Sequence, residues 1–368
     1  MRKMSLFVTL CLIVGLLAGC AGTPVIYYTD CTCPAGSHDA AAPAPAETTP
    51  APAETEAPVA AEGALKTGMV ISTSIRDSKS ATAEAEGEAA YDVTLVAVLV
   101  DDEGIIRDCV IDGVKGSVKF DTTGTITSDL TAAPATKNEL GEAYGMVAWG
   151  GAVAEWDAQA AAVAAACVGK HYNELQGVVV SESGYAPEGT DLATSATIYI
   201  GGYVKAIEQA AASAQHLGAQ SGDTLKLAVI NGIDGSTSAT EEKEGTAQLD
   251  VNAAAVTFSG ETISSCYIDA VQAKVNFDTT GTVTTDVSTT PSTKNQLGEN
   301  YGMVAWGGAI AEWNVQAASF ASYVTGKTAA EVAGIAIDES TKPADADLAT
   351  SVTISIGGFQ ALIAKAAQ

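Results

Sequence analysis

The sequence predicts an α+β fold built from two tandem copies of a small domain, each with an antiparallel sheet and packed helices. Long peptide strings occur twice in the chain, which indicates a duplicated unit. Each copy begins with β-branched and apolar runs separated by turn residues, as in a hairpin. Each copy then continues with apolar residues three and four positions apart, as in an amphipathic helix.

The repeat is the clearest feature of the chain. The segment YGMVAWGGAVAEW, from Tyr144 to Trp156, returns from Tyr301 to Trp313 with one change, Val153 to Ile310. Three other strings return as well, namely VKFDTTGT as VNFDTTGT, TKNELGE as TKNQLGE, and DLATS unchanged. A domain of about 150 residues is large enough to bury its own core. We therefore expect domain 1 over residues 64–215 and domain 2 over residues 223–368, folding as separate units joined near residues 216–223.

The chain begins with the pattern of a bacterial lipoprotein signal. Arg2 and Lys3 precede an apolar stretch that is too short to span a bilayer, and small residues lead to Cys20. This predicts a signal peptide over residues 1–19 and lipid on Cys20. Each buried methylene of a lipid chain contributes about 0.8 kcal/mol, so several chains would hold the protein at the outer face of the cell membrane.

The next segment has the composition of a spacer. Residues 20–63 form the lipidated N-terminus and a tether, which from Ala40 onward is almost entirely Ala, Pro, Glu and Thr. Such a composition buries too little apolar area to offset the cost of ordering the chain. We expect this tether to hold the folded part away from the bilayer.

Four elements are expected in the first copy, in chain order. Residues 92–100 and 105–111 should form a β-hairpin around Asp101-Asp102-Glu103-Gly104. An amphipathic helix is expected next, with Gly169 placed for a C-terminal cap. Its apolar stripe consists of Val153, Trp156, Ala160, Val163 and Cys167. A short strand is expected over residues 175–180, and a closing helix over residues 203–212.

Composition excludes several classes of function. The formal net charge is -26, so electrostatic binding of nucleic acid is excluded. Of the three histidines, His38, His171 and His216, none lies at metal-ligand spacing from another. The sequence therefore predicts no metal site and no histidine-based hydrolase. Cys109, Cys167 and Cys266 have apolar neighbours and are expected to be buried thiols.

One short motif near the end of the first copy suggests a cofactor. Residues 191–197, DLATSAT, resemble the motif of the FMN-binding domain family: Asp, two variable positions, Ser or Thr, Gly or Ser, then Ala-Thr. The resemblance implies that Thr197 carries FMN through a phosphoester bond made by a flavin transferase, with Asp191, Ser195 and Ala196 in the same motif. It covers this motif, the helix-like segment after it and, loosely, the hairpin. It further implies an electron carrier with an unassigned redox donor and acceptor, rather than an enzyme with substrate turnover.

Physical chemistry suggests where such a cofactor would rest. A phosphate beside a helix N-terminus meets unpaired backbone N–H groups and the positive end of the helix dipole. The flavin ring needs flat apolar contacts, which Trp149 and Met146 in the glycine-bounded repeat segment could provide. For Trp149 core packing is the favoured interpretation and ring contact the alternative, whereas Trp156 belongs to the helix stripe and the core.

The second copy carries the same motif with one difference. It begins at Asp347 and ends with Val352-Thr353, so a β-branched residue precedes the hydroxyl where the first copy has Ala196. A clash of about 1 to 3 kcal/mol in the transition state would slow transfer to Thr353 roughly tenfold to a hundredfold. We therefore expect Thr197 to be modified first.

A second function class remains open from sequence. The repeats would then be a flavin-free surface lipoprotein with a binding or structural role, and residues 191–197 would be only a turn with an N-cap. Flavin fluorescence on a denaturing gel distinguishes the two classes.

Overall fold

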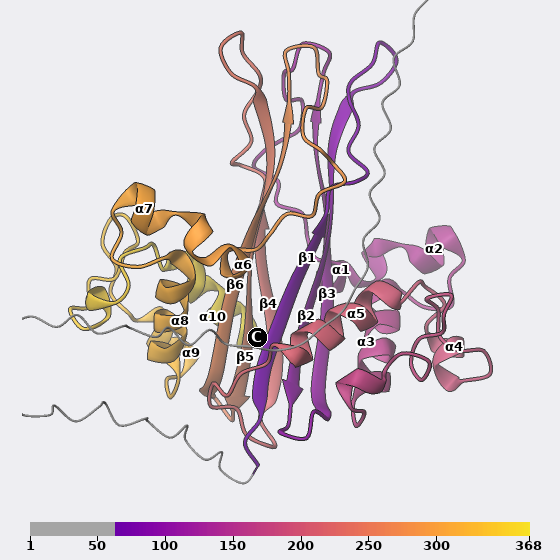
Figure 1. Cartoon of the computed structure of the whole chain (residues 1–368), viewed down its shortest axis with the longest axis vertical. Helices are drawn as coiled ribbons and strands as arrows, with labels where there is room; N and C mark the ends of the chain where they lie inside the picture. Colours follow the sequence, from indigo (N-terminus) through magenta and orange to yellow (C-terminus); the bar gives the residue numbers. More distant parts are fainter. Residues whose placement is uncertain (1–62) are drawn as a thin grey trace, which may run out of the picture. The chain divides into compact units, whose positions relative to one another are not determined.

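The computed structural model describes residues 63–368 (Figure 1). The residues predicted to form the signal peptide and the tether, Cys20 included, lie outside these described residues, apart from Gly63 at the end of the predicted tether. The fold class is α+β, as predicted, with two three-stranded antiparallel sheets. The strands of the first sheet are β1 (Lys66–Ser74), β2 (Gly87–Val100) and β3 (Ile106–Phe120), in that order; those of the second are β4 (Thr224–Gly232), β5 (Gly245–Ser259) and β6 (Thr262–Phe277).

Each half of the described chain also carries its own helices. In the first half these are α1 (Lys137–Leu140), η1 (Gly141–Tyr144), α2 (Met146–Gly150), α3 (Trp156–Cys167), η2 (Tyr172–Glu174), α4 (Asp191–Ser195) and α5 (Gly201–Ala212). In the second half they are α6 (Lys294–Leu297), η3 (Gly298–Tyr301), α7 (Met303–Gly307), α8 (Trp313–Val324), α9 (Ala329–Ala333), η4 (Leu348–Thr350) and α10 (Gly357–Ala366). Among residues 63–368, no helix has both the length and the apolar character that a membrane span requires.

Most of the elements expected from sequence are present. The predicted hairpin is confirmed as β2 and β3, the main amphipathic helix as α3, and the closing helix as α5. Gly169 follows the C-cap residue of α3 with a φ of +80°, as expected for the glycine that ends a helix. One residue of the predicted stripe was misplaced, because Val153 precedes α3 and is exposed.

The strand expected over residues 175–180 is wrong. The backbone N–H groups of Val178, Val179 and Val180 all donate to the carbonyl of Leu175, so the segment closes into a compact turn. Leu175, Val179 and Val180 are nonetheless buried, and they belong to the same core as α5. The apolar run therefore reflects burial, which a buried turn shares with a strand.

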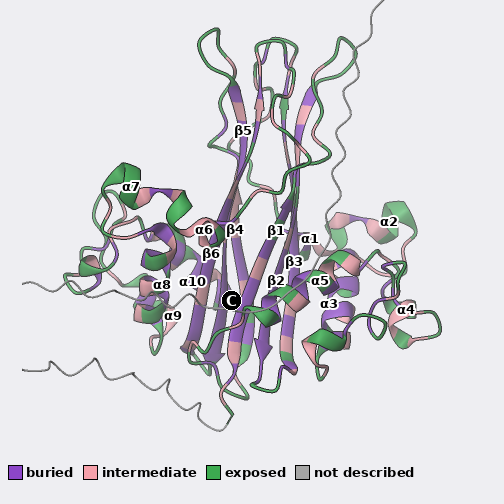
Figure 2. Cartoon of the chain, viewed as in Figure 1, coloured by how far each residue is buried: buried purple, intermediate pink, exposed green. Residues whose placement is uncertain are grey.

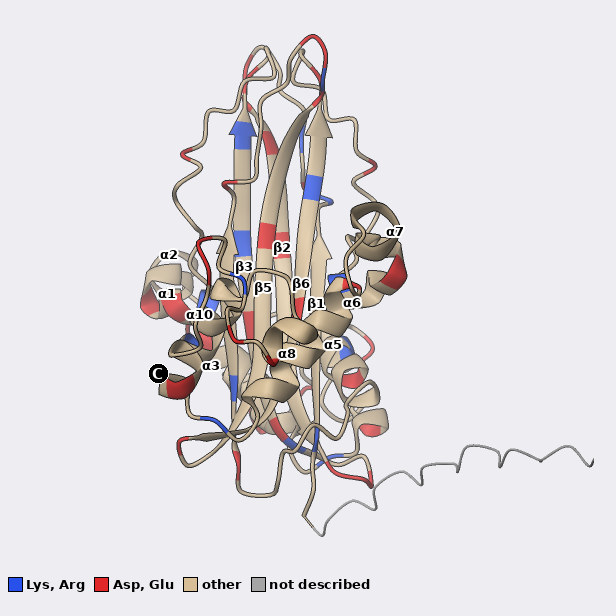
Figure 3. Cartoon of the chain, turned by 90° about the vertical axis from the view of Figure 1, so that its left-hand side faces the viewer, with Lys and Arg blue, Asp and Glu red and all other residues tan. Residues whose placement is uncertain are grey.

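Each sheet is covered on both faces. One face of β2 packs with α3 and α5, through Val96, Val98 and Val100. Its other face, through Val93, Leu95, Ala97 and Leu99, enters a core that also contains residues of β4, β5 and β6. Figures 1 and 2 show the result: the strands lie in the middle and are mostly buried, and the helices of each half lie outside their own sheet. Most of the length of the strands carries no charged residue (Figure 3).

The two halves therefore share one hydrophobic core between their sheets. Phe120 and Phe277 are both fully buried and stack on each other, with ring centroids 4.0 Å apart and an interplanar angle of 1°. This core does not fit the expectation that the halves fold as separate units. The domain boundaries themselves stay a prediction.

Contacts between the halves are reciprocal. The Ala81 N–H donates to the Gly281 carbonyl, and the equivalent Ala239 N–H donates to the Gly124 carbonyl, both at 2.8 Å. Two hydrogen bonds from backbone N–H groups to serine side chains are reciprocal in the same way. Ile126 N–H donates to Ser238 Oγ at 3.0 Å, and Val283 N–H donates to Ser80 Oγ at 2.9 Å. Such pairing of equivalent positions is the signature of a two-fold interface.

Candidate functional site

The predicted acceptor Thr197 lies in the connection between α4 and α5, and it is exposed. Its backbone N–H donates to Oε1 of Gln159 at 2.8 Å, and its hydroxyl lies 3.4 Å from the same oxygen. Gln159 is fully buried on α3, and its Nε2 donates to the Ala154 carbonyl at 2.7 Å. One buried amide therefore joins the acceptor residue to the end of the segment that carries Trp149.

The second half repeats this arrangement. Thr353 donates through its N–H to Oε1 of the buried Gln316 at 2.8 Å, with the hydroxyl at 3.2 Å. The Nε2 of Gln316 donates to the Ala311 carbonyl at 2.8 Å. Thr353 is half-buried, whereas Thr197 is exposed. Sequence reasoning missed both glutamines, because each lies more than 35 positions before its threonine, 38 in the first half and 37 in the second.

The clash expected at Val352 stays a prediction, and the burial of this side chain argues against it. Val352 is fully buried and Ala196 nearly so, which means that both side chains enter the core. The methyl groups of Val352 are therefore occupied in packing and do not stand beside an exposed hydroxyl. The difference in exposure between Thr197 and Thr353 remains as a physical reason for unequal modification.

The other motif residues lie around the short elements before each threonine. Asp191 begins α4 and is exposed, and its carbonyl accepts from the Ser195 hydroxyl at 3.2 Å. Asp347 is the N-cap residue of η4, without a side-chain capping bond. These contacts belong to local turns. None of the hydrogen bonds of the described residues indicates that either carboxylate binds a ligand.

The segment between Glu142 and Glu155, which carries Trp149, has an exposed apolar surface, called the platform below. Trp149 on α2 and Trp306 on α7 are each 90% exposed, so core packing, the favoured interpretation from sequence, is wrong. Figure 2 shows α2 and α7 as largely exposed helices on the outer side of each half. No charged residue occurs between Glu142 and Glu155, in a chain whose net charge is -26. Met146, by contrast, is half-buried against the helical core.

The platform is held in one conformation by its neighbours. The carboxylate of Glu155 accepts from the N–H groups of Met146 and Val147, at 2.8 and 3.0 Å. Gly145 has a φ of +81°, and a Cβ there would lie 2.4 Å from Cδ1 of Trp149. The indole ring thus rests directly on a glycine that no other residue can replace without strain. Glu312 and Gly302 do the same for Trp306.

The repeated Thr-Lys-Asn string, residues 136–138 in the first half, connects the helical segment before Trp149 to the sheet. Thr136 caps α1, and Asn138 donates through Nδ2 to the Ile111 carbonyl on β3 at 2.9 Å. The Nζ of the buried Lys137 lies 4.9 Å from the Trp156 ring centroid and 5.8 Å from that of Tyr144. This string therefore has a structural role: it joins α1 to β3, and its lysine makes cation–π contacts with two aromatic rings.

The equivalent Thr-Lys-Asn string of the second half contacts a buried carboxyl group. The protonation of this group makes the free energy of unfolding depend on pH. Asp269 on β6 accepts from the N–H groups of Ala270 and Asn295, and burial raises its pKa to about 6. An unfolded Asp has a pKa of about 3.9. Between roughly pH 4 and 6 the folded state therefore binds more protons, so the free energy of unfolding decreases as pH rises through this window.

We expect Asp269→Asn to reduce this dependence, because the amide keeps an acceptor oxygen and carries no charge. A difference of about two pKa units corresponds to on the order of 3 kcal/mol between pH 4 and pH 7. Urea unfolding at a series of pH values measures it. A pH slope that is identical in the parent protein and in Asp269→Asn would contradict the assignment.

The three predicted thiols are confirmed as buried. Cys109, Cys167 and Cys266 are free and buried, and burial raises the pKa of the Cys167 and Cys266 thiols to about 12. These thiols are protonated at neutral pH, so they act as small apolar side chains and not as nucleophiles.

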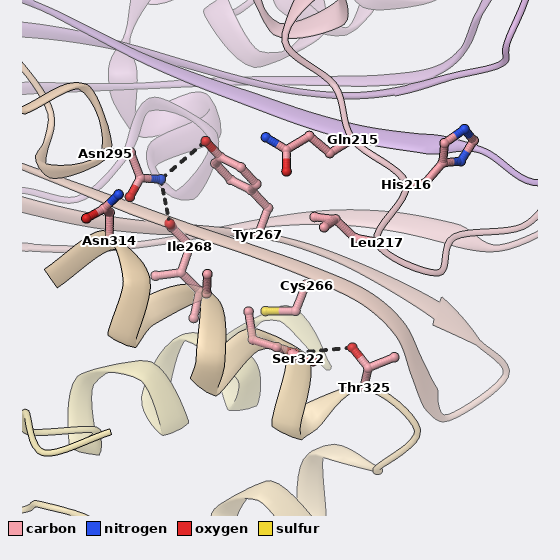
Figure 4. A pocket seen from close by; sticks show the side chains of 12 residues that line it. Gln215, His216, Leu217, Cys266, Tyr267, Ile268, Asn295, Asn314, Ser322 and Thr325 are labelled. Atoms are coloured by element: carbon pink, nitrogen blue, oxygen red, sulfur yellow. Dashed lines mark hydrogen bonds between the residues drawn. The ribbon is translucent and has the colours of Figure 1, made fainter. Parts of the chain in front are cut away.

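A cleft of about 640 Å³ lies between β6 and α8 (Figure 4). The segment after α5 forms its third side. Its lining residues come from that segment, from β6, from α6 and from α8: Gln215, His216, Leu217, Cys266, Tyr267, Ile268, Asn295, Asn314, Ala318, Ala321, Ser322 and Thr325. Thr197 and Trp149 are not among them. Sequence reasoning missed this cleft, because the lining residues come from four separate segments.

Comparisons of the chain with models of protein families, with curated proteins and with solved structures found no match.

Proposed function

We propose that the protein is a lipid-anchored, exported flavoprotein that carries FMN on Thr197, and more slowly on Thr353, and that relays electrons outside the cytoplasm. Its two halves would be tandem copies of one domain, an origin that the reciprocal contacts and the parallel order of elements support. The partners would be a flavin transferase, the membrane through Cys20, and a redox donor and acceptor. Bound FMN would supply one- and two-electron transfer.

The observation that carries the proposal is the buried glutamine of each half. Gln159 accepts a hydrogen bond from the backbone N–H of Thr197, which is an exposed residue. The same side chain donates to the segment that carries the exposed Trp149. A phosphate on Thr197 would lie four positions before α5 begins, and the N-terminus of α5 has no side-chain cap. The Gly201 N–H already donates to the Gly184 carbonyl, so the positive end of the helix dipole, not this N–H, would favour the phosphate. The uncovered face of Trp149 offers the flat apolar contact that a flavin ring needs.

The modification itself requires only an accessible hydroxyl on this chain. The oxygen of Thr197 would bond to the phosphorus of the FMN half of a flavin adenine dinucleotide donor, the phosphoanhydride would break, adenosine monophosphate would leave, and the transferase would take the hydroxyl proton. Gln159 would keep the acceptor loop in place during this transfer.

Co-expression of the full chain with a flavin transferase tests the proposal. We expect one covalently bound FMN on Thr197 by intact mass, followed by slower addition to Thr353, because Thr353 is half-buried. Thr197→Ala should lose the first addition. Thr122→Ala is the matched control, since Thr122 is also exposed and lies outside the motif. If no FMN is added under conditions that modify an established acceptor domain, the flavin proposal is wrong.

The exposed tryptophans favour a second candidate, a flavin-free surface-binding module. A charge-free patch around a 90% exposed Trp is unusual on a soluble protein and is typical of a binding surface. Sedimentation of the flavin-free protein with isolated cell walls tests this function. We expect binding to be lost in the double variant Trp149→Ala, Trp306→Ala and retained in Val178→Ala, which truncates an exposed apolar side chain elsewhere.

A further inference from the structure

We propose that the cleft between β6 and α8 binds a neutral, polyhydroxylated small molecule of the size of a mono- or disaccharide. This site is separate from the residues of the proposed flavin site. The cleft volume of about 640 Å³ lies within the range of small-molecule sites in proteins.

The chemistry of the lining excludes charged ligands. None of the lining residues is Asp, Glu, Lys or Arg. His216 lies at the edge and is exposed, and its Nε2 lies 3.0 Å from the Asp102 carboxylate, to which Lys66 is also paired. A cation would thus meet no lining carboxylate and an anion no lining ammonium group, although burial of either would require one.

The remaining lining combines neutral hydrogen-bonding groups with an apolar wall. Figure 4 places Asn295, Asn314 and Tyr267 at one end of the cleft, and Cys266, Ser322 and Thr325 toward the other. Tyr267 and Asn295 are already joined, since Asn295 Nδ2 donates to the Tyr267 hydroxyl at 3.2 Å. Leu217, Ile268, Ala318 and Ala321 contribute apolar surface. Hydroxyl groups on an otherwise apolar ring match such a lining, because each can both donate and accept.

The Asn314 side chain lines the cleft and is not fully hydrogen-bonded. Its Oδ1 is buried and has no hydrogen-bond partner among the described residues. A buried acceptor without a donor is destabilising, so such groups are rare in folded proteins. Because this oxygen has almost no accessible surface, a ligand hydroxyl in the cleft would donate to it only after rotation of the Asn314 side chain.

The equivalent cleft of the first half shows what is particular to this one. It lies between β3 and α3, has a volume of about 480 Å³, and shares Cys109, Ile111 and Asn138 with the corresponding positions Cys266, Ile268 and Asn295. Among the positions that line both clefts four differ, and at each the second half has a neutral hydrogen-bonding side chain: Tyr267 for Val110, Asn314 for Asp157, Ser322 for Ala165 and Thr325 for Val168. All four changes remove an apolar or acidic group, which points to one neutral, polar ligand.

The segment after α5 completes the site in the second half. Gln215 exchanges both backbone hydrogen bonds with Thr67 on β1, at 2.8 and 3.0 Å, which fixes the segment beside the cleft. Gly218 passes so close to β6 that a Cβ there would lie 2.2 Å from the Ser264 carbonyl oxygen. The cleft of the first half has no such segment among its lining residues.

Titration of the isotope-labelled full chain with neutral sugars tests the proposal. The probes are glucose, N-acetylglucosamine and its disaccharide, and the charged comparators are glucosamine and glucuronate. We expect at least one neutral probe to shift the side-chain amide signals of Asn295 and Asn314, and the charged comparators to bind at least tenfold more weakly. No shift with any of the three neutral probes, or equal binding of a charged comparator, would overturn the proposal.

Substitutions that exchange residues between the halves locate the binding. The variant Asn314→Asp, Ser322→Ala, Thr325→Val introduces the residues of the first half, and we expect affinity for the bound probe to fall at least tenfold. The pair Ser322→Ala, Thr325→Val alone changes exposed positions and should also weaken binding, which keeps the test valid if the buried change prevents folding. The matched control Asp157→Asn, Ala165→Ser, Val168→Thr should leave affinity unchanged. Unchanged affinity in both second-half variants would show that the probe binds elsewhere.

Discussion

Expressed alone, residues 63–221 should not form a stable monomer. In the intact protein the inner face of the first sheet packs on the second sheet, and Val93, Leu95, Ala97 and Leu99 are almost completely buried there. Without the second half these side chains, together with Phe120, would form one large exposed apolar patch. We therefore expect insoluble protein, or a dimer in which a second copy replaces the missing half.

Size-exclusion chromatography with light scattering and a thermal melt measure this outcome. The control is co-expression of residues 63–221 with residues 222–368, cut between the exposed Ser221 and Gly222. The two fragments should form a complex with a cooperative melt near that of the uncut chain. A soluble monomer of residues 63–221 with its own cooperative transition would contradict the shared core and support separately folding copies.

The stacked phenylalanines give the second large effect. Phe120→Ala or Phe277→Ala should lower the free energy of unfolding by about 3 to 5 kcal/mol, because each ring is fully buried and leaves a cavity in a core that both halves share. Domains of ordinary stability have about 5 to 15 kcal/mol in total. Each variant should therefore melt roughly 10 °C lower, at about 2 to 4 °C per kcal/mol for a chain of this size. Denaturant unfolding monitored by circular dichroism measures the change.

The double variant separates stacking from simple burial. The rings lie 4.0 Å apart and parallel, so truncating one removes part of what the other contributes. We expect the loss in Phe120→Ala, Phe277→Ala to differ from the sum of the single losses by about 0.5 to 3 kcal/mol. Phe320 is the matched control, since it is equally buried but lies in the helical core of the second half. Coupling between Phe120 and Phe320 as large as that between Phe120 and Phe277 would contradict a direct stacking contact.

Local sequence patterns predicted much of the fold correctly. The hairpin of β2 and β3, the helices α3 and α5, and the burial of three cysteines follow from residue type and spacing. Strands β1 and β4 were not predicted. The segment over residues 175–180 was misassigned, because a short apolar run has the same composition in a buried turn as in a strand.

The shared core also has a signal in the sequence. Residues 95–100 are buried at every position, without the alternation of a strand that has one face in water. An uninterrupted apolar run indicates a strand covered on both faces. Helices cover one face of β2, so the other face requires a second layer, which the second sheet provides.

By itself, the sequence determined the repeat, the fold class, the main amphipathic helices and the position of the candidate acceptors Thr197 and Thr353. Only the tertiary structure decided that the two halves share a core, that Gln159 joins Thr197 to the Trp149 segment, and that Asn314 faces a cleft. The physical reason is the range of the interactions. Helix and hairpin periodicity depend on residues a few positions apart, whereas these contacts join residues brought together only when the layers pack.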